Sequence, residues 1–140
     1  SDMPSGRIIW GEHRTSRSCA GCRNCIEACP TSCLRTDGYD ISRCLSLLSK
    51  EPTDFPEWVH RGWHNSLIGC RICQQVCPMN QTLFNKTETV AEFNESETTA
   101  LLTGIPFKDL TVVTQRKLHD FHLAAYYNIL PRNLRLLLGT

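Results

Sequence analysis

The sequence of 140 residues lacks three features that would assign it to common classes of protein. No run approaches the roughly 18 consecutive apolar residues of a membrane-spanning helix. The beginning of the chain has no apolar stretch typical of a secretory signal peptide. Fifteen Lys and Arg balance fourteen Asp and Glu, so a formal charge of +1 indicates no basic surface for nucleic acid or anionic lipid. We therefore expect a cytoplasmic protein that contacts neither membrane nor nucleic acid directly.

The sequence is rich in cysteine, with nine in all. An odd number leaves a disulfide scheme with one thiol over, and disulfide scaffolds are typical of secreted proteins. The pattern C-x2-C-x3-C-P occurs twice, as CRNCIEACP in residues 22–30 and as CRICQQVCP in residues 70–78. Cys19 extends the first copy to C-x2-C-x2-C-x3-C-P, the run that holds iron–sulfur clusters in bacterial two-cluster ferredoxins. The repeat therefore predicts two [4Fe-4S] clusters.

The ferredoxin rule also distributes the cysteines, because the cysteine before each proline binds the cluster of the other run. Cluster 1 would then be held by Cys19, Cys22, Cys25 and Cys77. Cluster 2 would be held by Cys29, Cys70 and Cys73, and it lacks one thiolate. The regular spacing would place that ligand three residues before Cys70, but Leu67 occupies this position.

Cys33 and Cys44 are the two cysteines left to supply the missing ligand. Asp40 is a good N-cap for a helix over residues 41–50, and on this helix Cys44 shares an inward face with Ile41 and other apolar residues. We predict that Cys44 completes cluster 2. Cys33 follows Cys29 closely beyond a proline, and we expect it to pack as a small apolar residue.

Structural zinc is the main alternative, since two C-x2-C pairs can form a four-thiolate tetrahedral site. The chain would then be a metal-stapled structural or interaction domain. The C-x3-C-P endings favour iron–sulfur clusters instead. Two histidine pairs have helical spacing, but we expect surface positions for them rather than metal ligation: His60 with His64, and His119 with His122.

The rest of the chain predicts an α+β fold that is mostly helical, with a ferredoxin-like two-[4Fe-4S] core, a helical insertion and a helical C-terminal tail. Residues 1–17 form an N-terminal arm, of which 1–3 resemble a remnant of an expression vector. The double-cluster domain spans 18–80, a polar linker 81–95 and the tail 96–140.

Besides the helix over 41–50, local signals predict four further helical segments outside the cluster loops. In the insertion, a short helix is expected over 57–65. In the tail, one helix ends at Gly104, a longer one spans 111–130 until Pro131 interrupts it, and 133–138 adds a last turn or two. We expect this tail to be independent of the cysteines.

Residues 19–80 resemble the C-terminal iron–sulfur part of the epoxyqueuosine reductase family, whose relatives include reductive dehalogenases. The resemblance is carried by CPT at 29–31, RCLSLL at 43–48 and GCRICQQVCPMN at 69–80, with LPRNL at 130–134 similar to the family's helical tail. It implies an electron-transfer module that passes single electrons to a corrinoid cobalt. The family's corrinoid-binding and substrate-binding half has no counterpart in this sequence. Cobalamin is therefore expected only with a partner protein or domain, and the chain is not expected to be catalytic alone. The same resemblance leaves the alternative that the chain is a fragment of an enzyme that acts in tRNA queuosine modification.

Overall fold

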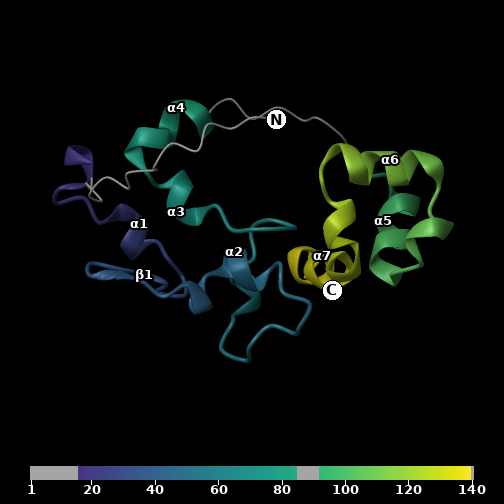
Figure 1. Ribbon diagram of the computed structural model, residues 1–140, viewed down its shortest axis with the longest axis horizontal. Helices are drawn as coiled ribbons and strands as arrows, with labels where there is room; N and C mark the ends of the chain where they lie inside the picture. Colours follow the sequence, from purple (N-terminus) through teal and green to yellow (C-terminus); the bar gives the residue numbers. More distant parts are fainter. Residues whose placement is uncertain (1–15, 85–91, 140) are drawn as a thin grey trace, which may run out of the picture.

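A computed structural model describes residues 16–84 and 92–139. Most of the predicted N-terminal arm and the middle of the predicted linker lie outside these residues. Short helices and one two-stranded sheet form the cysteine-rich part, and longer helices form the C-terminal part (Figure 1). The prediction of a mostly helical chain with a small β component is confirmed, whereas the ferredoxin-like topology stays a prediction. None of the helices in the described residues is long and apolar enough to cross a membrane.

The repeated sequence pattern becomes a repeated structure. Each copy forms a helix of four residues, α1 (Asn24–Glu27) and α3 (Ile72–Gln75), and these two helices contact each other (Figure 1). Gly21 and Gly69 precede the first cysteine of each copy and have φ angles of +77° and +92°, where a residue with a Cβ would be strained. The glycines allow the chain to turn into each cysteine loop.

The segment between the two copies differs from the predicted helix over 41–50. A hairpin of β1 (Leu34–Arg35) and β2 (Gly38–Tyr39) comes first, with its turn at Thr36 and Asp37. Asp40 then caps only the 3-10 turn η2 (Ile41–Arg43), and Cys44 has an extended backbone before α2 (Leu45–Leu48) begins. The prediction of one continuous helix is therefore wrong. The prediction that Ile41 faces inward is also wrong, because this residue is 54% exposed.

The prediction of a second helix in the insertion is also wrong. Residues 57–65 contain only the 3-10 turn η3 (Arg61–Trp63), which His60 caps by accepting the Gly62 N–H at 3.1 Å. Gly62 lies in the middle of the expected helix, where glycine costs about 1 kcal/mol relative to alanine. The remaining short elements of this part are η1 (Arg17–Cys19), η4 (Pro78–Asn80) and α4 (Gln81–Phe84).

The tail consists of α5 (Glu95–Thr103), η5 (Phe107–Asp109), α6 (Val112–Asp120), η6 (Ala124–Ile129) and α7 (Leu130–Leu138). Gly104 ends α5 with a φ of +67°, as predicted. The long helix predicted over 111–130 is wrong, because the chain breaks after α6 and His122 has a φ of +56°. Pro131 does not interrupt a helix. It lies in the first turn of α7, where a missing N–H costs nothing.

The main hydrophobic core lies in the tail, around the fully buried Leu118 and Leu130. Leu67 and Ile68, which come from the cysteine-rich part, pack against this core. The expectation that the tail is independent of the cysteines is therefore wrong, since the loop leading to Cys70 contributes to the packing of the tail.

Candidate iron–sulfur centres

One cavity of about 540 Å³ is lined by four cysteines, three from the first copy of the pattern and one from the second. Its wall includes Cys19, Cys22, Cys25 and Cys77, the set predicted for cluster 1. Cys19 ends η1, Cys25 lies in α1, and Cys77 is the N-cap of η4. Apolar side chains complete the wall, among them Ile26 and Leu34. The fold of the two copies thus brings Cys77 to the cysteines of the first copy.

A second, smaller cavity of about 60 Å³ contains the other cysteines. Its wall includes Cys29, Cys44, Cys70 and Cys73, the set predicted for cluster 2, together with Cys33. The extended backbone at Cys44 lets this residue reach the cavity, although the continuous helix expected to carry it is absent. Leu34 borders both cavities and lies between them.

The thiolates around both cavities suit [4Fe-4S] clusters. Within residues 16–84 and 92–139, no three His, Cys, Asp or Glu side chains converge tightly enough to hold one metal ion. A four-iron cluster takes one thiolate at each iron. The cysteines around each cavity supply at least four soft sulfur donors.

Polar side chains donate hydrogen bonds to sulfurs of the second set. The Asn65 amide donates to Cys70 Sγ at 3.5 Å, and the Gln74 amide donates to Cys73 Sγ at 3.9 Å. The Thr31 hydroxyl lies 3.6 Å from Cys29 Sγ. In the described part of the chain, no side chain makes such a bond to the first set. The two centres therefore differ in their polar surroundings.

Burial and these hydrogen bonds also shift the pKa values of the thiols. Burial raises the pKa of Cys29, but the Leu34 N–H and the Thr31 hydroxyl outweigh it, so the pKa is lowered overall. Burial raises the pKa of Cys73 despite the bond from Gln74. Burial and the neighbouring Cys44 raise the pKa of Cys33, which is only 4% exposed, to about 11. Cys33 lines the same cavity as the predicted ligands of cluster 2, and its packing role stays a prediction.

Arg43 joins the segments that carry Cys29 and Cys44. Its Nε donates to the Thr31 carbonyl at 2.9 Å, and its guanidinium lies 4.4 Å from the centre of the Trp58 ring. Because Thr31 follows Cys29 by two residues, this bond fixes one side of the second cavity. Trp58 is 40% exposed, so it packs against Arg43 at the surface and is not part of a buried core.

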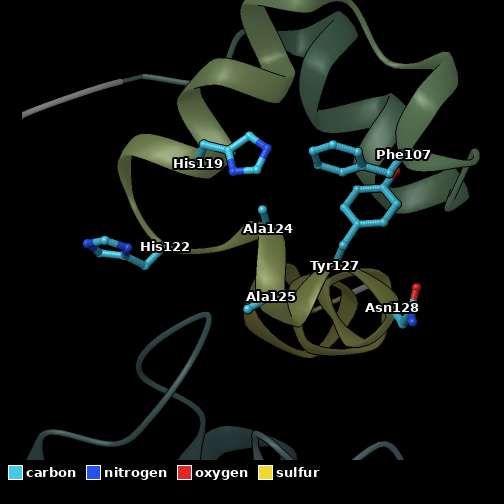
Figure 2. Close-up of a pocket in the computed structure, with 7 residues that line it drawn as sticks. All are labelled: Phe107, His119, His122, Ala124, Ala125, Tyr127 and Asn128. Atoms are coloured by element: carbon cyan, nitrogen blue, oxygen red, sulfur yellow. The ribbon is translucent and has the colours of Figure 1, made fainter.

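The histidine pairs form no shared ligand sites in the described residues. His60 caps η3, whereas His64 packs edge-on against Phe55, with ring centres 4.6 Å apart. His119 and His122 are exposed and border a shallow groove of the tail that also includes Phe107 and Tyr127 (Figure 2). Figure 2 shows the His119 ring facing Phe107, while His122 lies apart. Neither pair lines a cysteine cavity.

Residues 18–80 match the family model of the 4Fe-4S double cluster binding domain. The matched segment makes up a little less than half of the chain. The match covers both cysteine cavities and ends at Asn80, whose amide donates to Gln74 Oε1 at 2.8 Å. Iron–sulfur binding is therefore a property of the family, while the assignment of single cysteines to each cluster stays a prediction.

The resemblance to epoxyqueuosine reductases is also confirmed. The chain is 31% identical over 81 residues to the epoxyqueuosine reductase of Atelocyanobacterium thalassa, and the aligned segment covers 56% of the chain and 26% of the relative. It is 38% identical over 80 residues to that of Leadbetterella byssophila (56% and 26%) and 34% identical over 74 residues to that of Staphylococcus aureus (52% and 20%). The chain thus spans about a quarter or less of the length of these relatives. No solved structure matches it.

Several residues around the double-cluster domain were not predicted from the sequence. Thr31, Asn65 and Gln74 lie within five residues of the cysteines that they contact, so a search for polar side chains next to each ligand would have found them. Arg43 and Asn133 act over long sequence separations. Only the resemblance of residues 130–134 to the family's tail pointed to Asn133.

Proposed function

We propose that the chain is an electron-transfer module with two [4Fe-4S] clusters that delivers single electrons to a corrinoid-dependent reductase centre of the epoxyqueuosine reductase type. The observation that carries the proposal is the pair of cysteine-lined cavities within one double-cluster domain. The corrinoid centre would lie in a partner protein or in a further domain. The relatives support this reading, because they are named epoxyqueuosine reductases and are several times longer than the matched segment.

A [4Fe-4S] cluster exchanges one electron at a time and is held by four thiolates. In the proposed assignment, the first cavity holds cluster 1 and the second holds cluster 2. Leu34 separates the cavities with an apolar side chain, and Ile26 and Ile72 cover one cavity each. These side chains give both cavities apolar walls beside the thiolates.

The polar surroundings give the transfer a direction. N–H and O–H groups that donate to a thiolate stabilise the more negative, reduced state of a cluster and so raise its reduction potential. Asn65 and Gln74 donate to sulfurs of the second set, and the Thr31 hydroxyl lies 3.6 Å from Cys29 Sγ of the same set. Cys19, in contrast, is exposed and belongs to the first cavity. We infer that, with both clusters bound, the residues around Cys29, Cys70 and Cys73 would stabilise the reduced state of cluster 2, and the exposed Cys19 would mark the side on which an electron enters.

Anaerobic iron and acid-labile sulfide analysis, with EPR of the dithionite-reduced protein, tests the proposal. About eight iron and eight sulfide per chain, with the broadened signals of two coupled clusters, is the expected result. About four of each would remove one cluster from the proposal. Zinc without sulfide would replace it with the metal-stapled interaction domain. A search for corrinoid proteins that oxidise the reduced chain then tests the delivery of electrons.

A further inference from the structure

Asn133 on α7 joins two segments of the second cysteine centre. This side chain is buried, with 3% exposure, and its amide nitrogen donates to the Ser49 carbonyl at 2.8 Å and to the Leu67 carbonyl at 2.9 Å. Ser49 directly follows α2, the helix that begins after Cys44. Leu67 stands three residues before Cys70. One amide group therefore connects the segment of Cys44 to the segment of Cys70.

Ser49 carries this connection one step closer to the cysteines. Its hydroxyl accepts the Gly69 N–H at 2.8 Å and donates to the Ser46 carbonyl at 3.1 Å. Gly69 directly precedes Cys70 and has a φ of +92°, so the bond from its N–H holds the turn into the cysteine loop. The buried Ser49, at 3% exposure, thus fixes the loop from one side while Asn133 fixes it from the other.

Apolar and cationic contacts strengthen the same junction. Leu67, in the position where the regular run would have a cysteine, packs against the core of the tail. Arg132, next to Asn133, donates to the Leu48 and Thr53 carbonyls, and its guanidinium lies 4.2 Å from the centre of the Phe55 ring. In Figure 1, α7 accordingly lies beside α2. No residue that lines the first cavity makes a hydrogen bond to the tail within the described part of the chain.

We propose that α7 positions the second iron–sulfur centre, and that Asn133 is the residue that fixes the Cys44 segment relative to the Cys70 loop. The inference rests on the proposed function, because it takes Cys44 and Cys70 as ligands of one cluster. Without the Asn133 amide, the Leu67 carbonyl loses its donor and the Ser49 carbonyl keeps only the longer bond from Arg132 at 3.3 Å, so the two ligand segments can separate. Cluster 2 should therefore depend on the tail for retention and for its potential, and cluster 1 should not.

The test compares Asn133→Ala and Ser49→Ala with the control Asn128→Ala in the reconstituted protein. Asn128 is an exposed amide of the tail, at the groove in Figure 2. The EPR signal that disappears in Cys73→Ala identifies cluster 2. Iron release to a ferrous chelator and the midpoint potential of each signal are then measured. We expect both test variants to lose iron from cluster 2 about tenfold faster, as for other residues that hold metal ligands in place. Cluster 1 and the Asn128→Ala protein should behave as the wild type does.

The outcomes separate this inference from the proposed function. A wild-type protein without two clusters overturns the proposed function before any variant is compared. Two clusters in the wild type, with unchanged release and potential in both variants, overturn the role of Asn133 alone. Equal loss from both clusters in both variants also overturns it, because that result indicates general destabilisation. If Asn133→Ala does not fold, Ser49→Ala decides, since it removes one hydroxyl and leaves the backbone carbonyl that Asn133 contacts.

Discussion

Replacement of Asn65 tests directly how the chain tunes its second centre. The Asn65 amide nitrogen donates to Cys70 Sγ at 3.5 Å and to the Trp63 carbonyl at 3.1 Å, while its Oδ1 accepts the Arg71 N–H at 3.2 Å. Asn65→Ala removes the donor to the thiolate. Because that bond favours the more negative, reduced cluster, its loss should lower the reduction potential of cluster 2.

The size of the shift follows from the strength of the bond. A hydrogen bond to a charged group contributes about 1.5–3 kcal/mol, and only the difference between the oxidised and reduced states affects the potential. Asn65 is exposed, so water replaces part of what is lost. A difference of about 1 kcal/mol remains, and since 59 mV corresponds to a tenfold change for one electron, the potential should fall by about 40 mV.

The assay is an anaerobic dithionite titration followed by EPR at low temperature. Asn24→Ala is the matched control, because the Asn24 amide donates to the Val76 carbonyl at 3.5 Å and to no sulfur. Asn65→Asp keeps the acceptor oxygen for the Arg71 N–H but puts a carboxylate against the thiolate, and it should lower the potential further. A cluster 2 potential within error of the wild type in both Asn65 variants would refute the reasoning, and so would an equal shift of both clusters.

Three further predictions concern the ligand set and the tail. Cys44→Ala should lose one cluster, about four of the eight irons, whereas Cys33→Ala should keep all eight in iron analysis; the reverse would make Cys33 the ligand. Hydrogen bonds from a lysine on α6, from the backbone and from a threonine hold the pKa of Glu97 below its ordinary value. The ionised Glu97 carboxylate therefore stabilises the folded protein at pH values above its unfolded pKa, and this stabilisation is lost as the pH falls through the lower folded pKa. The thermal midpoint should therefore drop on acidification below about pH 4.3, and Glu97→Gln should flatten that drop. Leu118→Ala, at a fully buried site, should cost about 2–5 kcal/mol in urea unfolding, while Val112→Ala, 80% exposed, should cost less than about 0.5 kcal/mol.

The sequence predicted features that short segments determine by themselves. The two C-x3-C-P copies adopt one conformation because the same residue types recur at the same spacing, including Gly21 and Gly69 at positive φ. Gly104 ends α5 for the same local reason. The two cavities contain the two sets of cysteines that the pattern grouped, although ligation of each cluster stays a prediction.

Helix boundaries were less predictable, because weak local preferences competed with contacts far along the chain. Apolar spacing favoured one helix over 41–50, but Arg43 is held by the Thr31 carbonyl and Cys44 has an extended backbone. In the tail, apolar residues continue from α6 into η6, yet the positive φ at His122 turns the chain so that Tyr127 and Leu130 meet Leu118. Packing of the core, rather than helix propensity, decided where these helices end.

The unusual ligand of the second centre and the helical tail are two parts of one arrangement. Where the regular run has a cysteine, this chain has Leu67, whose side chain packs on the tail and whose carbonyl accepts from Asn133. A leucine in this position removes one thiolate, so the fourth ligand must come from a segment outside the run, which we predict to be Cys44. A ligand from a separate segment needs a means of holding that segment in register, and Asn133 bonds both Leu67 and Ser49, which follows α2. In this prediction, the leucine that stands in place of a cysteine packs on the same tail whose Asn133 holds the segment of Cys44.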